Sequence, residues 1–396
     1  MINQTATGRR SVVALGALML AGFAFFTVEM LPVGLLSVIA DDIGVSESTA
    51  GLLVTGYGVT VAIASLPLTH LVRRIPRRHL IAGLLAVFVV ATCVSVTGGY
   101  WLLLGGRVVT ALAQAVFWAV APPAAAALFS PQVRGRVTAA LIGGGSLASV
   151  LGVPTATWLG QQTGWRTAFL AVAGLGLLSL AGVAILMPTS SPDGGHAATG
   201  SAPDSRRYWT IVAATAVAIT GVFAAYTYIS PFLTEVSGFA PATVSVLLLV
   251  YGLAGPGGVA AGGALADRAP RAAMLAPLVI LSATLLTLYL FGTGQAATVV
   301  CVAVWGFAMP QIPATFQSRV LQVAPGSTDM ASAVFSAMFN VGIASGALIG
   351  SVLLAHTGVR STFLIAALLT AAALVTLLAG PRRGRASSQP GARDGG

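Results

Sequence analysis

The sequence predicts an all-α integral membrane protein whose twelve transmembrane helices form two pseudo-symmetric six-helix halves. Three observations carry this prediction: a scarcity of charge, a series of long apolar segments and an internal repeat. Only 8% of the 396 residues are charged and 56% are hydrophobic, whereas a soluble domain carries charge on about a quarter of its residues. The chain has too little polar surface to coat a globule in water, so its apolar segments are expected to lie in lipid.

Each apolar segment is long enough to cross a hydrocarbon core of roughly 30 Å as a helix. The segments occupy residues 11–40, 50–72, 79–97, 101–127, 137–159, 166–187, 208–231, 242–265, 272–292, 297–318, 330–354 and 361–380. Residues 188–207 are rich in Pro, Gly, Ser and Ala, which predicts a flexible linker. The predicted divisions are an N-terminal half (1–187), this linker (188–207), a C-terminal half (208–380) and a disordered tail (381–396).

The distribution of arginine predicts the orientation of the chain in the membrane. All 20 basic residues are arginines. If the N-terminus is cytoplasmic, 17 of the 20 fall in cytoplasmic loops or tails, and Arg107, Arg166 and Arg360 are left over. Because short cytoplasmic loops are enriched in basic residues, we expect both termini, the linker and the tail to be cytoplasmic. The net charge of +10 then reflects topology, and no nucleic-acid partner is expected.

The two halves are related by a constant offset of 194 residues. YGVTVAIASLPLTHLVRRIPRRHL, which begins at Tyr57, aligns with YGLAGPGGVAAGGALADRAPRAAM, which begins at Tyr251. The same offset aligns GWRTAFL from Gly164 with GVRSTFL from Gly358. One offset sustained over so long a stretch indicates a duplication with parallel topology. In secondary transporters built from such repeats, the substrate binds between the halves near the middle of the membrane.

Several stretches resemble motifs of the major facilitator superfamily. GGALADRAPR (Gly262–Arg271) resembles the loop motif of that family, and RVVTALAQA (Arg107–Ala115) resembles its span-4 motif, which begins with arginine. GGSLASVLGVPTATWLGQQTGWR (Gly144–Arg166) resembles the span-5 Gly-Pro motif of its drug:proton antiporters. With the stretch Glu29–Gly51, the chain resembles the bacterial efflux branch that holds sugar, nucleoside and chloramphenicol exporters. The resemblance covers essentially all twelve spans and implies a multi-pass protein of the bacterial inner membrane.

The resemblance also implies candidates for a gating loop and for a mobile helix. The loop candidates are Arg74, Arg77, Asp267, Arg268 and Arg271. The first copy of the loop departs from the family pattern, since its Asp is replaced by Arg73 and its Gly by Pro76. The loop is expected either to bridge to a neighbouring helix end or to be a plain basic flank.

In span 5 the candidates are Gly152 and Pro154. Small residues allow helices in lipid to pack closely, which serves either packing alone or the rocking of one half against the other. Proline can bend the helix that contains it.

Two charged residues are predicted to lie inside spans, Glu29 and Arg107. Burying a charge in a bilayer costs at least about 2.5–3.5 kcal/mol on insertion scales, so such residues usually serve function. Glu29 is the one acid of ten that falls within a span, and the repeat places Phe223 and Cys301 at the positions of Glu29 and Arg107. We expect this pair to couple protons to transport. The alternatives are that Glu29 is permanently protonated and that Arg107 reaches the outer interface.

The substrate is expected in a cavity lined by amide and aromatic side chains. Amides are costly in lipid without partners, and aromatic rings can stack on a planar or sugar-like ligand. The candidates are Tyr57, Gln114, Trp118, Tyr226, Tyr228, Gln311, Gln317 and Asn340. For the tryptophan and the tyrosines, simple packing is an equal alternative.

The predicted function is proton-coupled export of a small organic molecule such as a drug, sugar, nucleoside or metabolite, by alternating access. The alternative is proton-coupled import. The sequence contains no nucleophile–base pair, no metal-ligand spacing and no nucleotide-binding Gly-rich loop, so neither an enzyme nor a cofactor or metal is predicted. The expected partners are the substrate, protons and the lipid bilayer, and the chain is expected to be a monomer.

Overall fold

The computed structural model describes residues 2–72, 75–130, 134–188, 202–326 and 328–380, and within these ranges the regular structure is entirely helical. The helices are α1 (Ile2–Gly34), α2 (Leu36–Ile43), α3 (Glu47–Val72), α4 (Arg77–Ser95), α5 (Tyr100–Ala127), α6 (Arg134–Leu147), the π-helical turn η2 (Ala148–Gly152), α7 (Val153–Thr163), α8 (Trp165–Leu186), α9 (Ser205–Tyr226), α10 (Ile229–Pro231), the π-helical turn η3 (Phe232–Val236), α11 (Pro241–Arg268), α12 (Pro270–Phe291), α13 (Gln295–Ala308), α14 (Gln311–Val323), α15 (Thr328–Thr357) and α16 (Val359–Ala379). Most of the predicted linker and the whole predicted tail lie outside the described residues.

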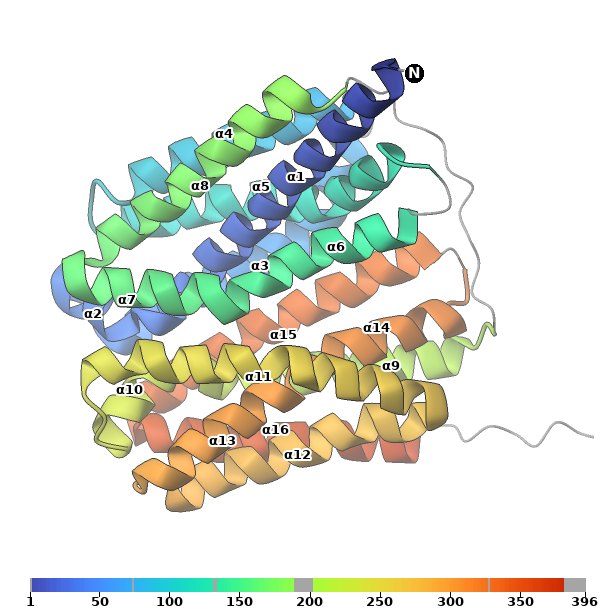
Figure 1. The fold of residues 1–396 in the computed structure, drawn as a ribbon. Helices are drawn as coiled ribbons and strands as arrows, with labels where there is room; N and C mark the ends of the chain where they lie inside the picture. Colours follow the sequence, from blue (N-terminus) through green and yellow to red (C-terminus); the bar gives the residue numbers. More distant parts are fainter. Residues whose placement is uncertain (1, 73–74, 131–133, 189–201, 327, 381–396) are drawn as a thin grey trace, which may run out of the picture.

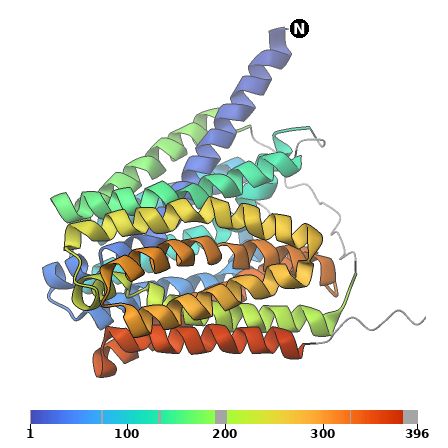
Figure 2. The same ribbon diagram turned by 60° about the horizontal axis from the view of Figure 1, so that its bottom comes forward.

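The predicted all-α transmembrane fold is confirmed. Within the described residues, eleven segments are long and apolar enough to span a membrane. The remaining predicted span, 137–159, is divided among α6, η2 and α7. In Figure 1, α1–α8 form the upper group of helices and α9–α16 the lower group. Figure 2 gives a second view, in which α11 runs alongside α7.

Several predicted single spans are broken, and prolines lie at or near the breaks. Pro154 follows the π-helical turn of span 5 by two residues, and because proline lacks an N–H, the carbonyl four residues before it loses its helical partner. Pro310 separates α13 from α14 in the tenth span. The first span ends as a continuous helix at Gly34, two residues after Pro32, and resumes as α2.

The halves contact each other at two positions that the repeat relates. Gly58 on α3 faces α15, where a Cβ atom added to it would lie 3.1 Å from the Ala344 backbone nitrogen. Gly252 on α11 faces η2, where an added Cβ would lie 2.6 Å from the Cα of Val150. The offset of 194 makes Gly252 the equivalent of Gly58, and Val150 the equivalent of Ala344. The duplicated Tyr-Gly sequence therefore places its glycine at the crossing point of the halves in both copies.

At the end of the bundle opposite the N-terminus, further bonds join the halves. The Gln161 amide at the end of α7 donates to the Pro241 carbonyl at the start of α11 over 2.7 Å. The Ser351 hydroxyl of α15 donates to the Ser48 carbonyl of α3 over 2.8 Å. The two halves are therefore closed against each other at this end.

Candidate functional site

Arg107 is the centre of the polar site in the N-terminal half. It projects from α5 and is 2% exposed. Its guanidinium donates to three backbone carbonyls: Nε to Leu53 on α3 at 3.0 Å, Nη1 to Val28 on α1 at 2.9 Å and Nη2 to Glu29 on α1 at 3.0 Å. The planar guanidinium can satisfy several acceptors at once, so Arg107 ties three spans together.

A missing helix donor explains why one of these carbonyls is free to bind arginine. Pro32 lies within α1, and proline has no N–H with which to bond the carbonyl four residues earlier. That carbonyl belongs to Val28, which instead accepts from Arg107. The guanidinium thus replaces the donor that the proline removes. Arg107 is buried, and its guanidinium bonds the backbone carbonyl of Glu29 and not its carboxylate. Its part in proton coupling stays a prediction.

Glu29 belongs to a chain of side-chain hydrogen bonds across α1, α5 and α3. The Gln114 amide Nε2 donates to Glu29 Oε2 at 2.7 Å, and the Tyr57 hydroxyl donates to Gln114 Oε1 at 2.7 Å. The Arg107 guanidinium lies over the Tyr57 ring, with Cζ 4.8 Å from the ring centroid. All four residues are candidates predicted from the sequence, and the structure brings them together.

The carboxylate of Glu29 retains capacity for a further ligand. Its side chain is 7% exposed. Among the described residues only Gln114 bonds the carboxylate, at Oε2, so Oε1 has no protein donor there. A carboxylate accepts at both oxygens and becomes a donor when protonated. The arrangement can therefore bind a proton or a hydroxyl group at Oε1 while Gln114 holds the other oxygen.

In the C-terminal half an aromatic cluster lies around the repeat partner of Tyr57. The rings of Tyr226 on α9 and Tyr251 on α11 have centroids 5.1 Å apart and are tilted by 32°. Trp305 on α13 stands nearly perpendicular to both, with centroids 5.8 Å from Tyr226 and 6.0 Å from Tyr251. Only Tyr226 was a sequence candidate. The equivalence of Tyr251 with Tyr57 was the signal that pointed to Tyr251, whereas Trp305 carried no such signal.

The other cavity candidates do not join these two groups. Trp118 on α5 packs against Gly22 on α1 and Gly145 on α6. The Tyr228 hydroxyl donates to the Ala347 carbonyl at 2.9 Å, and its ring fills the space above Gly51 of the opposite half.

The remaining amides bond within the second half. Gln311 and Asn340 donate to carbonyls one turn earlier, at 2.9 and 3.0 Å respectively. Gln317 of α14 donates to the Ser332 hydroxyl of α15 at 3.1 Å. These three amides therefore have partners within the second half.

The gating-loop candidates lie near the helix ends on the side of the N-terminus. Arg74 is outside the described residues. Arg77 begins α4, while Asp267, Arg268 and Arg271 are exposed around the junction of α11 and α12. Among the described residues Asp267 forms no ion pair. In span 5, both Gly152 and Pro154 are buried, and Gly152 packs against the Phe23 ring of α1, 2.9 Å from an added Cβ.

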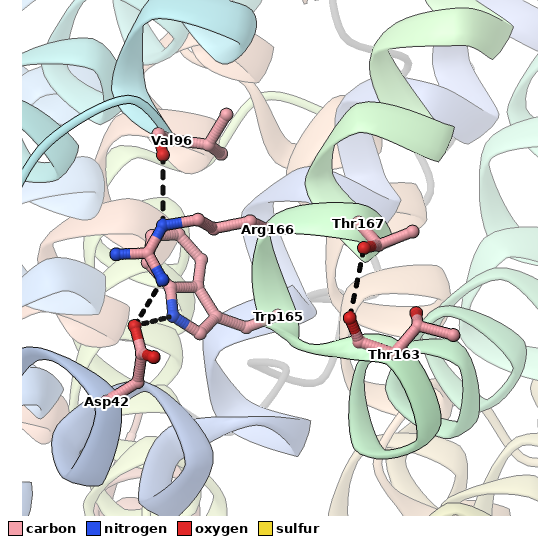
Figure 3. Close-up of polar contacts among 6 residues, drawn as sticks. All are labelled: Asp42, Val96, Thr163, Trp165, Arg166 and Thr167. Atoms are coloured by element: carbon pink, nitrogen blue, oxygen red, sulfur yellow. Dashed lines mark hydrogen bonds and ion pairs between the residues drawn. The ribbon is translucent and has the colours of Figure 1, made fainter.

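A polar network at the opposite end was not predicted (Figure 3). Asp42 of α2 accepts from the Trp165 indole N–H at 2.9 Å and also from the Arg166 guanidinium. Arg166 Nε donates to the Val96 carbonyl at 3.1 Å, at the end of α4. The indole N–H, followed by the guanidinium, lowers the pKa of the Asp42 carboxyl below its ordinary value.

Two of the arginines that the predicted topology left over, Arg166 and Arg360, have equivalent roles in the two halves. The repeat partner of Arg166 is Arg360, which donates to the Tyr289 and Leu290 carbonyls at 2.7 and 3.0 Å near the end of α12. Each arginine therefore satisfies carbonyl groups that have no partner at a helix C-terminus. Their presence at this end follows from helix capping.

The described residues contain no group of three or more His, Cys, Asp or Glu side chains that could hold a metal ion. Cys93 and Cys301 are both free thiols. The chemistry available at the site is therefore that of one carboxylate, one guanidinium, amides and phenols.

Comparison with known proteins places this architecture among transporters. Residues 18–329 match the Major Facilitator Superfamily. The chain is 32% identical over 362 residues to a probable sugar efflux transporter of Helicobacter acinonychis (strain Sheeba), covering 90% of this chain and 92% of that protein. It is 31% identical over 379 residues to the uncharacterized MFS-type transporter YtbD of Bacillus subtilis (strain 168), covering 94% of this chain and 96% of that protein.

Solved structures share the fold at low sequence identity. A bacterial homolog of the human lysosomal transporter Spinster, in an inward-facing and occupied conformation, superposes with a TM-score of 0.73 at 15% identity, covering 92% of this chain and 95% of that chain. The human organic anion transporter MFSD10 superposes with a TM-score of 0.67 at 16% identity, covering 94% and 99%. These likenesses establish the fold of the chain.

Proposed function

This chain belongs to the Major Facilitator Superfamily of transporters, and we propose that it exports a small hydroxyl-bearing organic molecule in exchange for protons. The observation that carries the proposal is the Glu29 carboxylate, which lies inside a membrane span with one oxygen bonded to Gln114 and the other without a donor among the described residues. Relatives over 30% identical that are named probable sugar efflux transporters support the export direction and the chemical class.

The proposed coupling rests on competition for one carboxylate. When Glu29 is ionised, Oε1 can accept a hydrogen bond from a substrate hydroxyl. When Glu29 is protonated, its O–H becomes a donor and the group loses its negative charge. A proton arriving from outside would therefore weaken the hold on an outgoing substrate, and release of the proton to the cytoplasm would restore it. Arg107 supports this cycle by fixing the backbone of α1 beside the carboxylate.

The proposed orientation places both termini in the cytoplasm of a bacterial inner membrane, as the arginine distribution favours. The end at which Gln161 bonds Pro241 would then face outward, and the described conformation would be closed to the outside. We propose that the transporter acts as a monomer, because each chain carries both halves of the site.

The test is transport by purified protein in proteoliposomes with an imposed pH gradient. A panel of labelled neutral sugars and nucleosides identifies a transported compound with the wild-type protein. Glu29→Gln keeps the size and hydrogen-bonding capacity of the side chain but cannot titrate. We expect it to lose pH-driven accumulation by more than about tenfold while retaining exchange of labelled for unlabelled compound, because exchange needs no net proton movement.

Glu235→Gln is the matched control, because it makes the same chemical change at an exposed position and should leave accumulation unchanged. Full pH-driven accumulation by Glu29→Gln would remove this carboxylate from the coupling mechanism. Movement of the compound in the same direction as the proton would reverse the proposed assignment from export to import.

A further inference from the structure

We infer that Tyr226, Tyr251 and Trp305, here called the aromatic triad, bind a ring of the substrate, and that this ring is neutral and carries hydroxyl groups. The inference rests on the proposed function, which supplies the existence of a substrate. It adds that the C-terminal half recognises the substrate ring. The triad comes from three helices, α9, α11 and α13. Its two tyrosine rings form a tilted pair against which the indole stands as a wall.

The triad carries polar atoms that have no hydrogen-bond partner among the described residues. The Trp305 side chain is fully buried, and its indole N–H has no hydrogen-bond partner. The hydroxyls of Tyr226 and Tyr251 form no hydrogen bond with any described residue, although each side chain is only 7% exposed. A buried donor without an acceptor is costly, and lipid offers no replacement. A ligand rich in hydroxyl oxygens would supply the missing acceptors and donors.

The repeat provides an internal reference for this reading. Tyr57, the partner of Tyr251 in the other half, has its hydroxyl bonded to Gln114 at 2.7 Å. The residue that replaces Gln114 in the second half is Ala308, and the residue that replaces Glu29 is Phe223. The second half therefore has the tyrosine but not the amide that bonds its hydroxyl in the first half, nor the carboxylate that this amide bonds in turn.

The triad also lies beside the contact between the halves. Tyr251 immediately precedes Gly252, whose Cα faces the backbone of η2 in the other half. The backbone of Tyr251 is therefore close to this contact, while its ring packs on Tyr226 and Trp305 within its own half. No charged side chain forms a hydrogen bond or an ion pair with the triad among the described residues, so recognition would depend on ring faces and neutral hydrogen bonds. This chemistry selects a neutral hydroxylated ring over a cation.

The experiment measures equilibrium binding to the purified full chain in detergent, without any pH gradient. The ring probes are methyl α-D-glucoside, lactose and uridine. Sorbitol serves as an acyclic polyol and tetraphenylphosphonium as a cation. The wild-type protein should bind at least one ring probe about tenfold more tightly than sorbitol or the cation. Trp305→Phe removes the N–H together with part of the ring and should weaken binding of that probe by at least about tenfold, the effect of losing one hydrogen bond.

Trp209→Phe is the matched control, because Trp209 is an exposed tryptophan on α9 and should bind as the wild type does. If Trp305→Phe aggregates, Tyr251→Phe and Tyr226→Phe decide, since they keep the rings and remove only hydroxyls. Unchanged binding by these variants, or preference of the wild type for sorbitol or the cation, or binding of none of the ring probes, overturns the inference. Because this binding is measured without a pH gradient, a failure of proton coupling at Glu29 in the transport assay leaves the result intact.

Discussion

Around a tyrosine that the repeat places in both halves, one half of the protein carries charged residues and the other carries uncharged ones. Around Tyr57 lie Glu29, Arg107 and Gln114, joined by hydrogen bonds and a cation–π contact. Around Tyr251, the equivalents of those three are Phe223, Cys301 and Ala308. The tyrosine is common to both halves, but the residues around it are charged or polar in the first half and apolar in the second.

The contacts between the halves did not diverge in the same way. Gly58 and Gly252 occupy equivalent crossing points against Ala344 and Val150. Close approach of two helices leaves room only for small residues, so this constraint acts on both copies. The side chains that face each half's own interior need only satisfy one another. The comparison therefore separates positions fixed by packing from positions free to acquire different chemistry.

The largest effect is expected from removing the charge of Arg107, which has no counterpart in the second half. Arg107→Ala should destabilise the protein by about 3 kcal/mol, because three buried carbonyls lose their donor. Cys301→Ala, the truncation at the equivalent position of the other half, should destabilise the protein by about 1 kcal/mol or less. The measurement is the amount of monodisperse protein that remains after heating in detergent. Equal losses for the two variants would show that Arg107 does not hold α1, α3 and α5 together.

A second substitution tests the specific role of the proline. Pro32→Ala restores an N–H that can bond the Val28 carbonyl within α1. In the Arg107→Ala background it should recover about 1 kcal/mol, while the same substitution at Pro256, which lies inside α11 and away from Arg107, should recover nothing. Identical behaviour of the two proline variants would contradict the replacement of a helix donor by arginine.

Substitution by alanine should slow transport to different degrees at the two crossing glycines, Gly58 and Gly252. An added Cβ at Gly252 would lie 2.6 Å from Val150 Cα and closer still to the Ser149 carbonyl oxygen, whereas at Gly58 the nearest atom is 3.1 Å away. Overpacking of this kind costs about 1–3 kcal/mol, so Gly252→Ala should slow transport about tenfold or more and Gly58→Ala only a few-fold. Transport in proteoliposomes measures both.

Labelling of a cysteine introduced at Gln161 should show why Gly252→Ala slows transport. Gly252→Ala is expected to increase the accessibility of that position, because the halves can no longer close there, with Cys93→Ser and Cys301→Ser in the background to remove native thiols. A Gly252→Ala protein that transports normally and stays closed would mean that η2 yields readily to the added methyl group.

The smallest effect is expected at the end of the bundle, where the halves differ by one carboxylate. Arg166 has Asp42 as its partner, while Arg360 lies over the Tyr289 ring, 5.4 Å from its centroid. Asp42→Asn should cost about 0.5 kcal/mol or less at neutral pH, because the pair is close to half exposed and exposed ion pairs contribute little.

The pH dependence of this effect has a definite sign. The Trp165 N–H and Arg166 lower the Asp42 pKa from its ordinary value of 3.8, so the carboxylate stabilises the folded state above that value. The contribution is lost as the pH falls through the lowered pKa. Heating curves of wild type and Asp42→Asn should therefore converge in acid below about pH 4. Divergence in acid would show that the protonated carboxyl, and not the carboxylate, is the stabilising form.

The sequence by itself determined the membrane class, the helical spans and the repeat, because these depend on local hydrophobicity and on residue identity at a fixed offset. It also indicated Glu29 and Arg107 as unusual, since a charge within an apolar segment is visible without a structure. The breaks near Pro32, Pro154 and Pro310 follow from a missing N–H, yet the sequence analysis placed continuous spans across them. Whether a helix bends, forms a π-turn or stops at proline depends on what its neighbours can bond.

Only the tertiary structure decided which side chains meet. Arg107 binds carbonyls and not the Glu29 carboxylate, because the rotation of α5 about its axis and the gap left by Pro32 fix where the guanidinium points. Trp305 joins Tyr251 because α13 crosses α11 at that level, and no residue pattern in either segment specifies that height. Contacts between helices depend on the rotation of each helix about its axis and on the height at which two helices cross. Small residues elsewhere in the chain affect both, because they set how closely the backbones approach.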